Sequence, residues 1–189
     1  MFSLRRILTL ALASVACARA LDVRQAANTN PSISTIVDHL DETMRHAGPT
    51  ILTLMANQTL SDATLQNQMN TIGAAFKNVT TGLAATPVSS GSTTVMPTDD
   101  DIAITYSDAM QLVSASLSGI VRNGKAPSFP AMVATLDPIM AAAAKQFNTT
   151  LPNSLSLVAI MLRDAGQFLI AEGFNQTFAA IGPITAPTT

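Results

Sequence analysis

Apolar residues recur along the chain in alternating steps of four and three, which is the spacing of one face of an α-helix. The clearest run comprises Leu65, Met69, Ile72, Phe76, Val79 and Leu83. A second run comprises Ile102, Tyr106, Ala109, Val113, Leu117 and Ile120. The same alternation lets helices pack at the shallow crossing angles of bundles. Both segments are therefore predicted to be amphipathic helices of one bundle.

Two further runs with helical spacing contain a proline in their interior. The first helix is predicted to begin near Ser32 and to kink or restart at Pro49, because proline lacks the amide hydrogen that a helix interior needs. The helix that follows the second clear run is predicted to begin near Pro130 and to kink at Pro138 for the same reason.

The last long helix is predicted to open after Pro152 and to end near Gly173. Its apolar face comprises Leu155, Val158, Leu162, Ala165 and Leu169. Phe174, Phe178 and Ile181 can form a short closing helix. No segment shows the two-residue alternation of a strand, and an aromatic content of 4% is poor in residues that sheets favour.

Polar residues mark the ends of the two clearest helices. Ser61 and Thr98 are predicted N-caps, since their hydroxyls can accept bonds from the free amides of a first turn. Gly124 is predicted to end the second helix in a left-handed conformation. The three aspartates at 99–101 are interpreted as complements of the helix dipole, with a cation site as the alternative.

The sequence predicts an all-α protein, a bundle of about five amphipathic helices, some kinked at proline. Residues 86–97 are rich in Ser, Thr, Pro and Gly without periodicity, which predicts a flexible loop. Neither side of this loop has a core of its own, so residues 32–182 are predicted to form a single helical-bundle domain. Residues 21–31 and 183–189 are predicted to be disordered.

The first segment is predicted to be a cleaved signal peptide, residues 1–20. Arg5 and Arg6 precede an apolar stretch at 7–16, and cleavage is expected between Ala20 and Leu21. A transmembrane anchor is disfavoured, because about 20 apolar residues are needed to cross a bilayer. A lipoprotein signal at Cys17 is the other alternative.

Cleavage changes the chemistry of the chain. It removes the only cysteine, so the mature protein is expected to contain no disulfide. It also removes Arg5, Arg6 and Arg19, which takes the formal net charge from −2 to −5. An acidic chain with scattered lysines and arginines is not expected to bind nucleic acid. The protein is predicted to be secreted and extracellular, either free or associated with a cell wall.

Four N-glycosylation sequons agree with an exported protein. They begin at Asn57, Asn78, Asn148 and Asn175. Asn57 and Asn148 follow apolar periodic segments, where a turn would admit a glycan, so they are favoured over the other two.

No catalytic motif is present, and the protein is predicted not to be an enzyme and to need no cofactor. His39 and His46 are the only histidines and share one helix face with Glu42. A metal site there can be imagined, but zinc usually takes three or four ligands from more than one element. Two solvated histidines are the favoured interpretation, and no metal is predicted.

The predicted inward faces are rich in methionine, whose flexible side chain can adapt around an apolar guest. Ordinary core packing is the alternative. The candidate lipid-binding residues that line this interior are Met44, Met69, Phe76, Met110, Val113, Leu117, Met140, Phe147 and Met161.

The layout resembles the fungal secreted family of hydrophobic surface-binding protein A and the cell wall galactomannoproteins. The similarity lies in the signal peptide, the absence of mature cysteines and the succession of short amphipathic helices. Its most telling part begins at Pro97 and Thr98 and continues through the second clear helix to the Ala126, Pro127 and Phe129 loop and the helix after it. A proline at position 138 departs from the continuous helix expected in that family.

The resemblance implies a helical bundle that adsorbs to hydrophobic surfaces or binds lipids such as fatty acids at or outside the cell wall. The alternative is a structural or host-interacting effector that acts through protein contacts, with the loop at 86–97 meeting a partner. The sequence does not identify such a protein partner.

Overall fold

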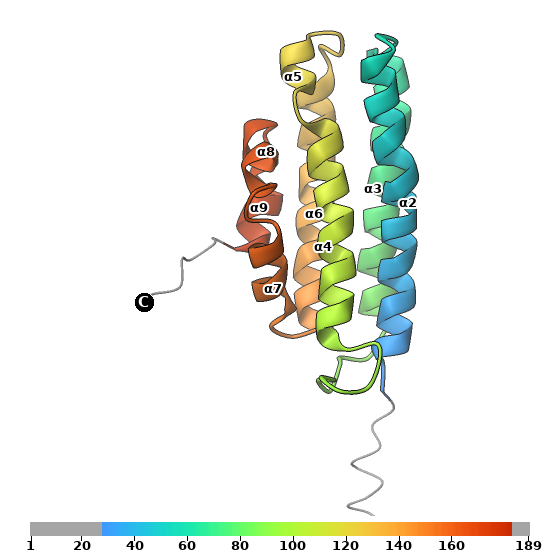
Figure 1. Cartoon of the computed structure of the whole chain (residues 1–189), viewed down its shortest axis with the longest axis vertical. Helices are drawn as coiled ribbons and strands as arrows, with labels where there is room; N and C mark the ends of the chain where they lie inside the picture. The colour runs from blue at the N-terminus through green and yellow to red at the C-terminus, as the bar shows by residue number, and fades with distance from the viewer. Residues whose placement is uncertain (1–27, 183–189) are drawn as a thin grey trace, which may run out of the picture.

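A computed structural model describes residues 28–182, and these residues contain helices and no strands. The four long helices are α2 (Asn30–Ala56), α3 (Asp62–Ala84), α4 (Asp99–Leu117) and α6 (Phe129–Thr150). They run side by side along the long axis of the molecule (Figure 1). The all-α class predicted from the apolar spacing is confirmed.

The helices are arranged as a closed ring. Helix α2 packs against both α3 and α4, and α3 packs against α6. The chain after α6 forms α7 (Ser154–Met161), α8 (Gly166–Ala171) and α9 (Asn175–Ile181). Because α7 lies mainly on α4 and α9 lies mainly on α6, this C-terminal layer closes the ring between those two helices (Figure 1).

The two clearest apolar runs form the core of the ring, as predicted. Every residue of both runs is buried. The rings of Tyr106 in α4 and Phe147 in α6 are stacked with their centroids 4.3 Å apart. Large side chains thus fill the space between α4 and α6 that the C-terminal layer closes from outside.

The predicted kinks at proline do not divide their helices. Helix α2 continues through Pro49 and α6 continues through Pro138. Each proline lacks the amide hydrogen that would bond to the carbonyl four residues earlier, which is that of Arg45 or Ala134. Both prolines and both of these residues are exposed, so the two carbonyls can bond to water. Packing of both helices along their full length outweighs the local cost, because tertiary contacts supply most helix stability.

Helix α2 also begins earlier than predicted. Asn30 is its first residue and is buried, so Asn30 and Pro31 are not part of a disordered N-terminus. The Asn30 side chain donates hydrogen bonds to the Pro97 carbonyl at 3.0 Å and to Asp99 at 2.6 Å. These bonds join the start of α2 to the start of α4. The predicted signal peptide, residues 21–27 and residues 183–189 lie outside the described residues.

Two predicted helices are divided in the structure. Helix α4 ends at Leu117, Gly119 adopts φ +83°, and a separate turn, α5 (Ile120–Asn123), follows. The predicted left-handed Gly124 is confirmed. The predicted fifth helix is split into α7 and α8. The Ser114 hydroxyl of α4 donates to the Ala165 carbonyl at 2.7 Å, at the end of the turn between them. The bundle therefore contains more helical segments than the sequence predicts.

Both predicted N-caps are confirmed. Ser61 accepts a bond from the Thr64 amide, and Thr98 accepts one from the Asp101 amide. Asp101 accepts in return from Thr98, and these bonds lower the pKa of the Asp101 carboxyl. The acidic start of α4 thus acts as a helix cap.

Replacing Thr98 by alanine is expected to raise the pKa of Asp101 toward its ordinary value near 3.9. A carboxyl whose pKa is lowered by folding stabilises the fold above that ordinary value, and loses the contribution as the pH falls through its lowered value. The deficit of the variant relative to the parent should thus be full near neutral pH and shrink in acid. An NMR titration of Asp101 tests the change in its pKa. Unfolding of parent and variant, measured near neutral pH and in acid, tests the change in stability.

The loop between α3 and α4 is attached to the bundle at Ser89. Its amide donates to the Thr150 carbonyl at 2.8 Å, and its hydroxyl donates to the Asn30 side chain at 2.7 Å. The later part of the loop exposes Val95 and Met96, which are 60% and 70% exposed. No helix within residues 28–182 is both long and apolar enough to cross a membrane.

Candidate functional site

The residues predicted to line a lipid-binding interior are mostly packed against one another. Eight of them are at most 3% exposed and belong to the continuous core: Met44, Met69, Phe76, Met110, Val113, Leu117, Met140 and Phe147. The prediction for Met161 is wrong, because this side chain is 37% exposed at the end of α7. The methionine-rich interior therefore behaves as core packing in this conformation.

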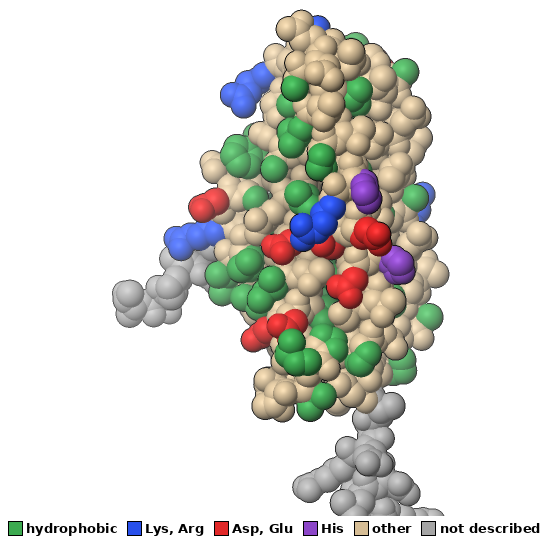
Figure 2. Space-filling model, turned by 45° about the vertical axis from the view of Figure 1, so that its right-hand side comes forward, with side chains coloured by type: hydrophobic (Ala, Val, Ile, Leu, Met, Phe, Trp, Pro, Cys, Tyr) green, Lys and Arg blue, Asp and Glu red, His purple; other side chains and the backbone are tan. Residues whose placement is uncertain are grey.

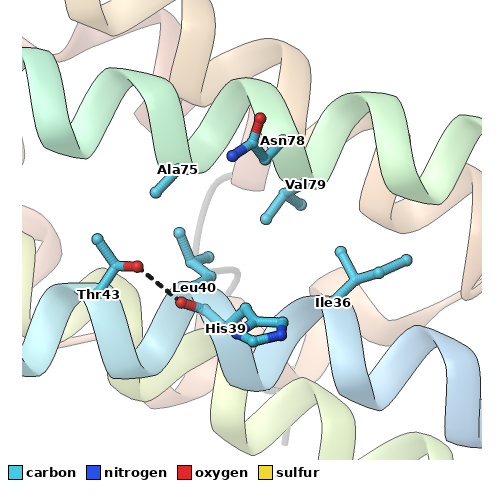
Figure 3. A pocket seen from close by; sticks show the side chains of 7 residues that line it. All are labelled: Ile36, His39, Leu40, Thr43, Ala75, Asn78 and Val79. Carbon is cyan, nitrogen blue, oxygen red and sulfur yellow. Dashed lines mark hydrogen bonds between the residues drawn. The ribbon is translucent and has the colours of Figure 1, made fainter.

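Hollows occur on the outside of the bundle, where two long helices meet. One of about 300 Å³ lies between α2 and α3 and is bordered by His39, Thr43 and Asn78 (Figure 3). Its floor is apolar, with Ile36, Leu40, Ala75 and Val79. The Thr43 hydroxyl donates to the His39 carbonyl at 2.8 Å, so its hydrogen bond is made within α2.

The two histidines remain on the exposed face of α2. His39 Nδ1 lies 3.7 Å from a Glu42 carboxylate oxygen, and both side chains are more than two-thirds exposed. Within residues 28–182, no three histidine, cysteine or acidic side chains come close enough together to hold a metal ion. His39 and Glu42 therefore form a solvent-exposed surface contact.

Arg45 and Tyr106 have shifted pKa values, but Arg45 is paired with a neighbouring carboxylate and Tyr106 is buried. Arg45 Nε donates to Asp41 at 2.6 Å, and this bond, with the charges of Asp41 and Asp108, raises the pKa of Arg45. Burial raises the pKa of Tyr106, whose hydroxyl has no hydrogen-bond partner among residues 28–182. Neither group offers a nucleophile or an acid-base pair to a substrate.

The four sequon asparagines are all exposed, but their surroundings differ. Asn57 follows the last residue of α2, and the Thr59 of its sequon is also exposed. The sequons of Asn148 and Asn175 end in buried threonines, Thr150 and Thr177, whose hydroxyls donate to the Leu83 and Asp137 carbonyls. Asn78 lies in the middle of α3.

The C-terminal layer carries an apolar outer face, which we define as Ile160, Met161, Phe168 and Ile170. These side chains are between 37% and 64% exposed, although they alternate with the buried Leu162 and Leu169. Hydrophobic side chains gather near the left edge of Figure 2, on the side where the C-terminal layer lies. Arg163, Asp164 and Gln167 are exposed in the same stretch, so the apolar side chains share this surface with polar ones. Exposed apolar side chains that gather on one side of a protein are typical of a contact surface.

The sequence analysis missed this face because it sought one apolar stripe in each helix. The signal was present in the stretch from Leu155 to Leu162, where apolar residues occur on every side of α7. No protein-family model matches the sequence, and no curated protein matches it either.

Proposed function

We propose that the protein is secreted, is not an enzyme, and binds hydrophobic surfaces or lipids at or outside the cell wall. The observation that supports this most is the apolar outer face of the C-terminal layer. The resemblance to the hydrophobic surface-binding and galactomannoprotein family points to the same activity. Each Å² of apolar area removed from water contributes about 25 cal/mol, so four half-exposed apolar side chains favour adsorption.

The position of the outer face suits adsorption without unfolding. Ile160 and Phe168 lie on short helices that also carry the buried Val158 and Leu169. The layer is held to α4 by the bond from Ser114 to Ala165 and by a bond from the Gln111 side chain to the Met161 carbonyl at 3.2 Å. The bundle can therefore present this face while its own core stays closed.

Replacing both Ile160 and Phe168 by serine is expected to weaken adsorption by about tenfold or more, because two apolar contacts are lost. The measurement is depletion of the folded protein from solution by octyl-coated beads, with circular dichroism of the unbound protein. Replacing Leu52 by serine is the matched control, since Leu52 is 45% exposed but lies on α2. Equal adsorption of the double variant and the control would contradict the proposal.

The alternative function is that of a structural or host-interacting effector with a protein partner. The exposed Val95 and Met96 in the loop before α4 favour this alternative. Their replacement by serine is expected to leave bead adsorption unchanged under the main proposal. If adsorption depended on these loop residues and not on Ile160 and Phe168, the assigned face would be wrong.

A further inference from the structure

The hollow between α2 and α3 has a sequon asparagine on its border. Asn78 lies on the α3 side, and His39 and Thr43 lie on the α2 side (Figure 3). The Asn78 side chain is exposed, whereas Leu40 and Val79 in the floor are only 1% exposed. A position at which a glycan can be attached therefore lies at the edge of a recess in the surface.

The chemistry of this hollow suits a neutral sugar. The floor is apolar, and the lining contains no aspartate, glutamate, lysine or arginine. A pyranose ring has one face of C–H groups, which packs on an apolar floor, and hydroxyl groups around its edge, which bond to uncharged polar groups. A volume of about 300 Å³ is small for a ligand site and suits a single monosaccharide.

The polar groups on the α2 side are available to a sugar. The Thr43 hydroxyl donates its hydrogen to the His39 carbonyl, so its oxygen can still accept a hydrogen bond from a sugar hydroxyl. His39 Nδ1 lies 3.7 Å from the Glu42 carboxylate, which is beyond hydrogen-bond distance. The His39 side chain is 77% exposed, so its ring can turn to pack against a sugar above the hollow.

We propose that Asn78 is N-glycosylated and that the hollow between α2 and α3 holds the first N-acetylglucosamine of the glycan. In the transfer, Asn78 Nδ2 forms a bond to C1 of the sugar and loses one proton to the solvent. The bond from C1 to the diphosphate of a lipid-linked oligosaccharide donor breaks, and the diphosphate leaves with the electron pair. This donor belongs to the secretory pathway, so the glycan at Asn78 depends on the secretion proposed above.

Covalent attachment makes the contact between sugar and hollow intramolecular. Because the sugar is joined directly to the Asn78 amide, its effective concentration at the hollow is high, and weak contacts are enough to hold it there. Thr80 of the same sequon is half-buried, and its hydroxyl donates to the Phe76 carbonyl at 3.0 Å. A transferase must reach Asn78 and Thr80 together, so the transfer is expected before α3 folds.

A glycan at Asn78 gives the proposed adsorption an orientation. Helices α2 and α3 lie on one side of the bundle, and α7 and α8 lie on the other (Figure 1). A glycan is bulky and strongly hydrated, so it keeps the α2 and α3 side in water. Ile160 and Phe168 then face a hydrophobic surface from the opposite side of the molecule.

The test uses the full chain secreted by a yeast host, with peptide mass spectrometry to measure the occupancy of each sequon. We expect Asn78 to be occupied. An endoglycosidase that leaves one N-acetylglucosamine on each occupied asparagine then prepares the protein for NMR. We expect nuclear Overhauser contacts between the sugar on Asn78 and the ring protons of His39, and none with His46, seven residues further along α2.

Two substitutions at Thr80 separate the sugar from the asparagine that carries it. Thr80→Ala keeps Asn78 but destroys the sequon, so the contacts with His39 should be lost and its ring signals should shift. Thr80→Ser keeps the sequon and should preserve both. Asn57→Gln is the matched control, because it removes a glycan from the end of α2 and should leave the His39 signals as in the parent.

The outcomes distinguish the glycan site from the proposed function. A secreted protein without a glycan at Asn78 would overturn the site and leave the proposed function in place. A glycan at Asn78 that makes no contact with His39, or His39 signals that are the same in the Thr80→Ala variant and the parent, would do the same. A chain that stays in the cytoplasm without any glycan would contradict the proposed secretion and the glycan site with it.

Discussion

Replacing Phe147 by alanine is expected to lower the free energy of unfolding by about 3–5 kcal/mol, because the change leaves a large void in a packed interior. Phe147 is fully buried, and its ring stacks on Tyr106 where α4 and α6 approach each other. No disulfide is expected to compensate for this loss. Urea unfolding followed by circular dichroism at 222 nm measures the change.

The control for this prediction is Tyr106→Phe, which keeps the stacked ring and removes a hydroxyl without a partner. A buried polar group with no hydrogen bond costs stability, so this variant is expected to be as stable as the parent or more stable by about 1 kcal/mol. A loss below about 1 kcal/mol for Phe147→Ala would contradict close packing between α4 and α6 around this ring.

Replacing Asp137 by alanine is expected to cost about 3 kcal/mol, because it leaves buried amides of α9 without an acceptor. Asp137 is only 4% exposed. Its carboxylate accepts hydrogen bonds from the Gln176 amide at 2.9 Å and from the Thr177 amide at 2.7 Å. Thr177 is itself fully buried. Asp137 thus caps the start of α9 from a different helix and attaches the end of the C-terminal layer to α6.

Hydrogen exchange locates the effect of the Asp137 variant. Amides of α9 should exchange faster than in the parent, whereas those of α2 and α3 should keep their order of protection. Asp164→Ala is the matched control, since Asp164 is exposed in the turn between α7 and α8 and is expected to change stability by less than about 0.5 kcal/mol. Equal effects of the two variants would show that α9 is held by apolar packing alone.

The apolar outer face belongs to the last third of the chain, which closes the ring between α4 and α6. Val158, Leu162 and Leu169 belong to the apolar face predicted for this segment, and all three are buried. Ile160 and Phe168 lie outside that predicted face and are exposed.

Composition alone did not establish whether the methionine-rich interior leaves space for a ligand. Met44, Met110 and Met140 were candidate ligand-contacting residues because of their side-chain chemistry, and the structure places them in a closed core. Side-chain type says what an interior could accommodate. Whether space remains depends on how the opposing faces interdigitate, which involves residues far apart in the chain.

The amino-acid sequence by itself determined the helical class, the inward faces of α3 and α4, and the caps at Ser61 and Thr98. These features depend on contacts within a few residues, so the local pattern is sufficient to specify them. The sequence alone also supplies the prediction of a cleaved export signal.

Only the tertiary structure decided that α2 and α6 continue through their prolines and that the last helix is divided. Both outcomes come from contacts with other helices, such as Ser114 with Ala165, which no local spacing encodes. The same holds for the exposure of Ile160, because an apolar side chain stays exposed only where no other helix covers it.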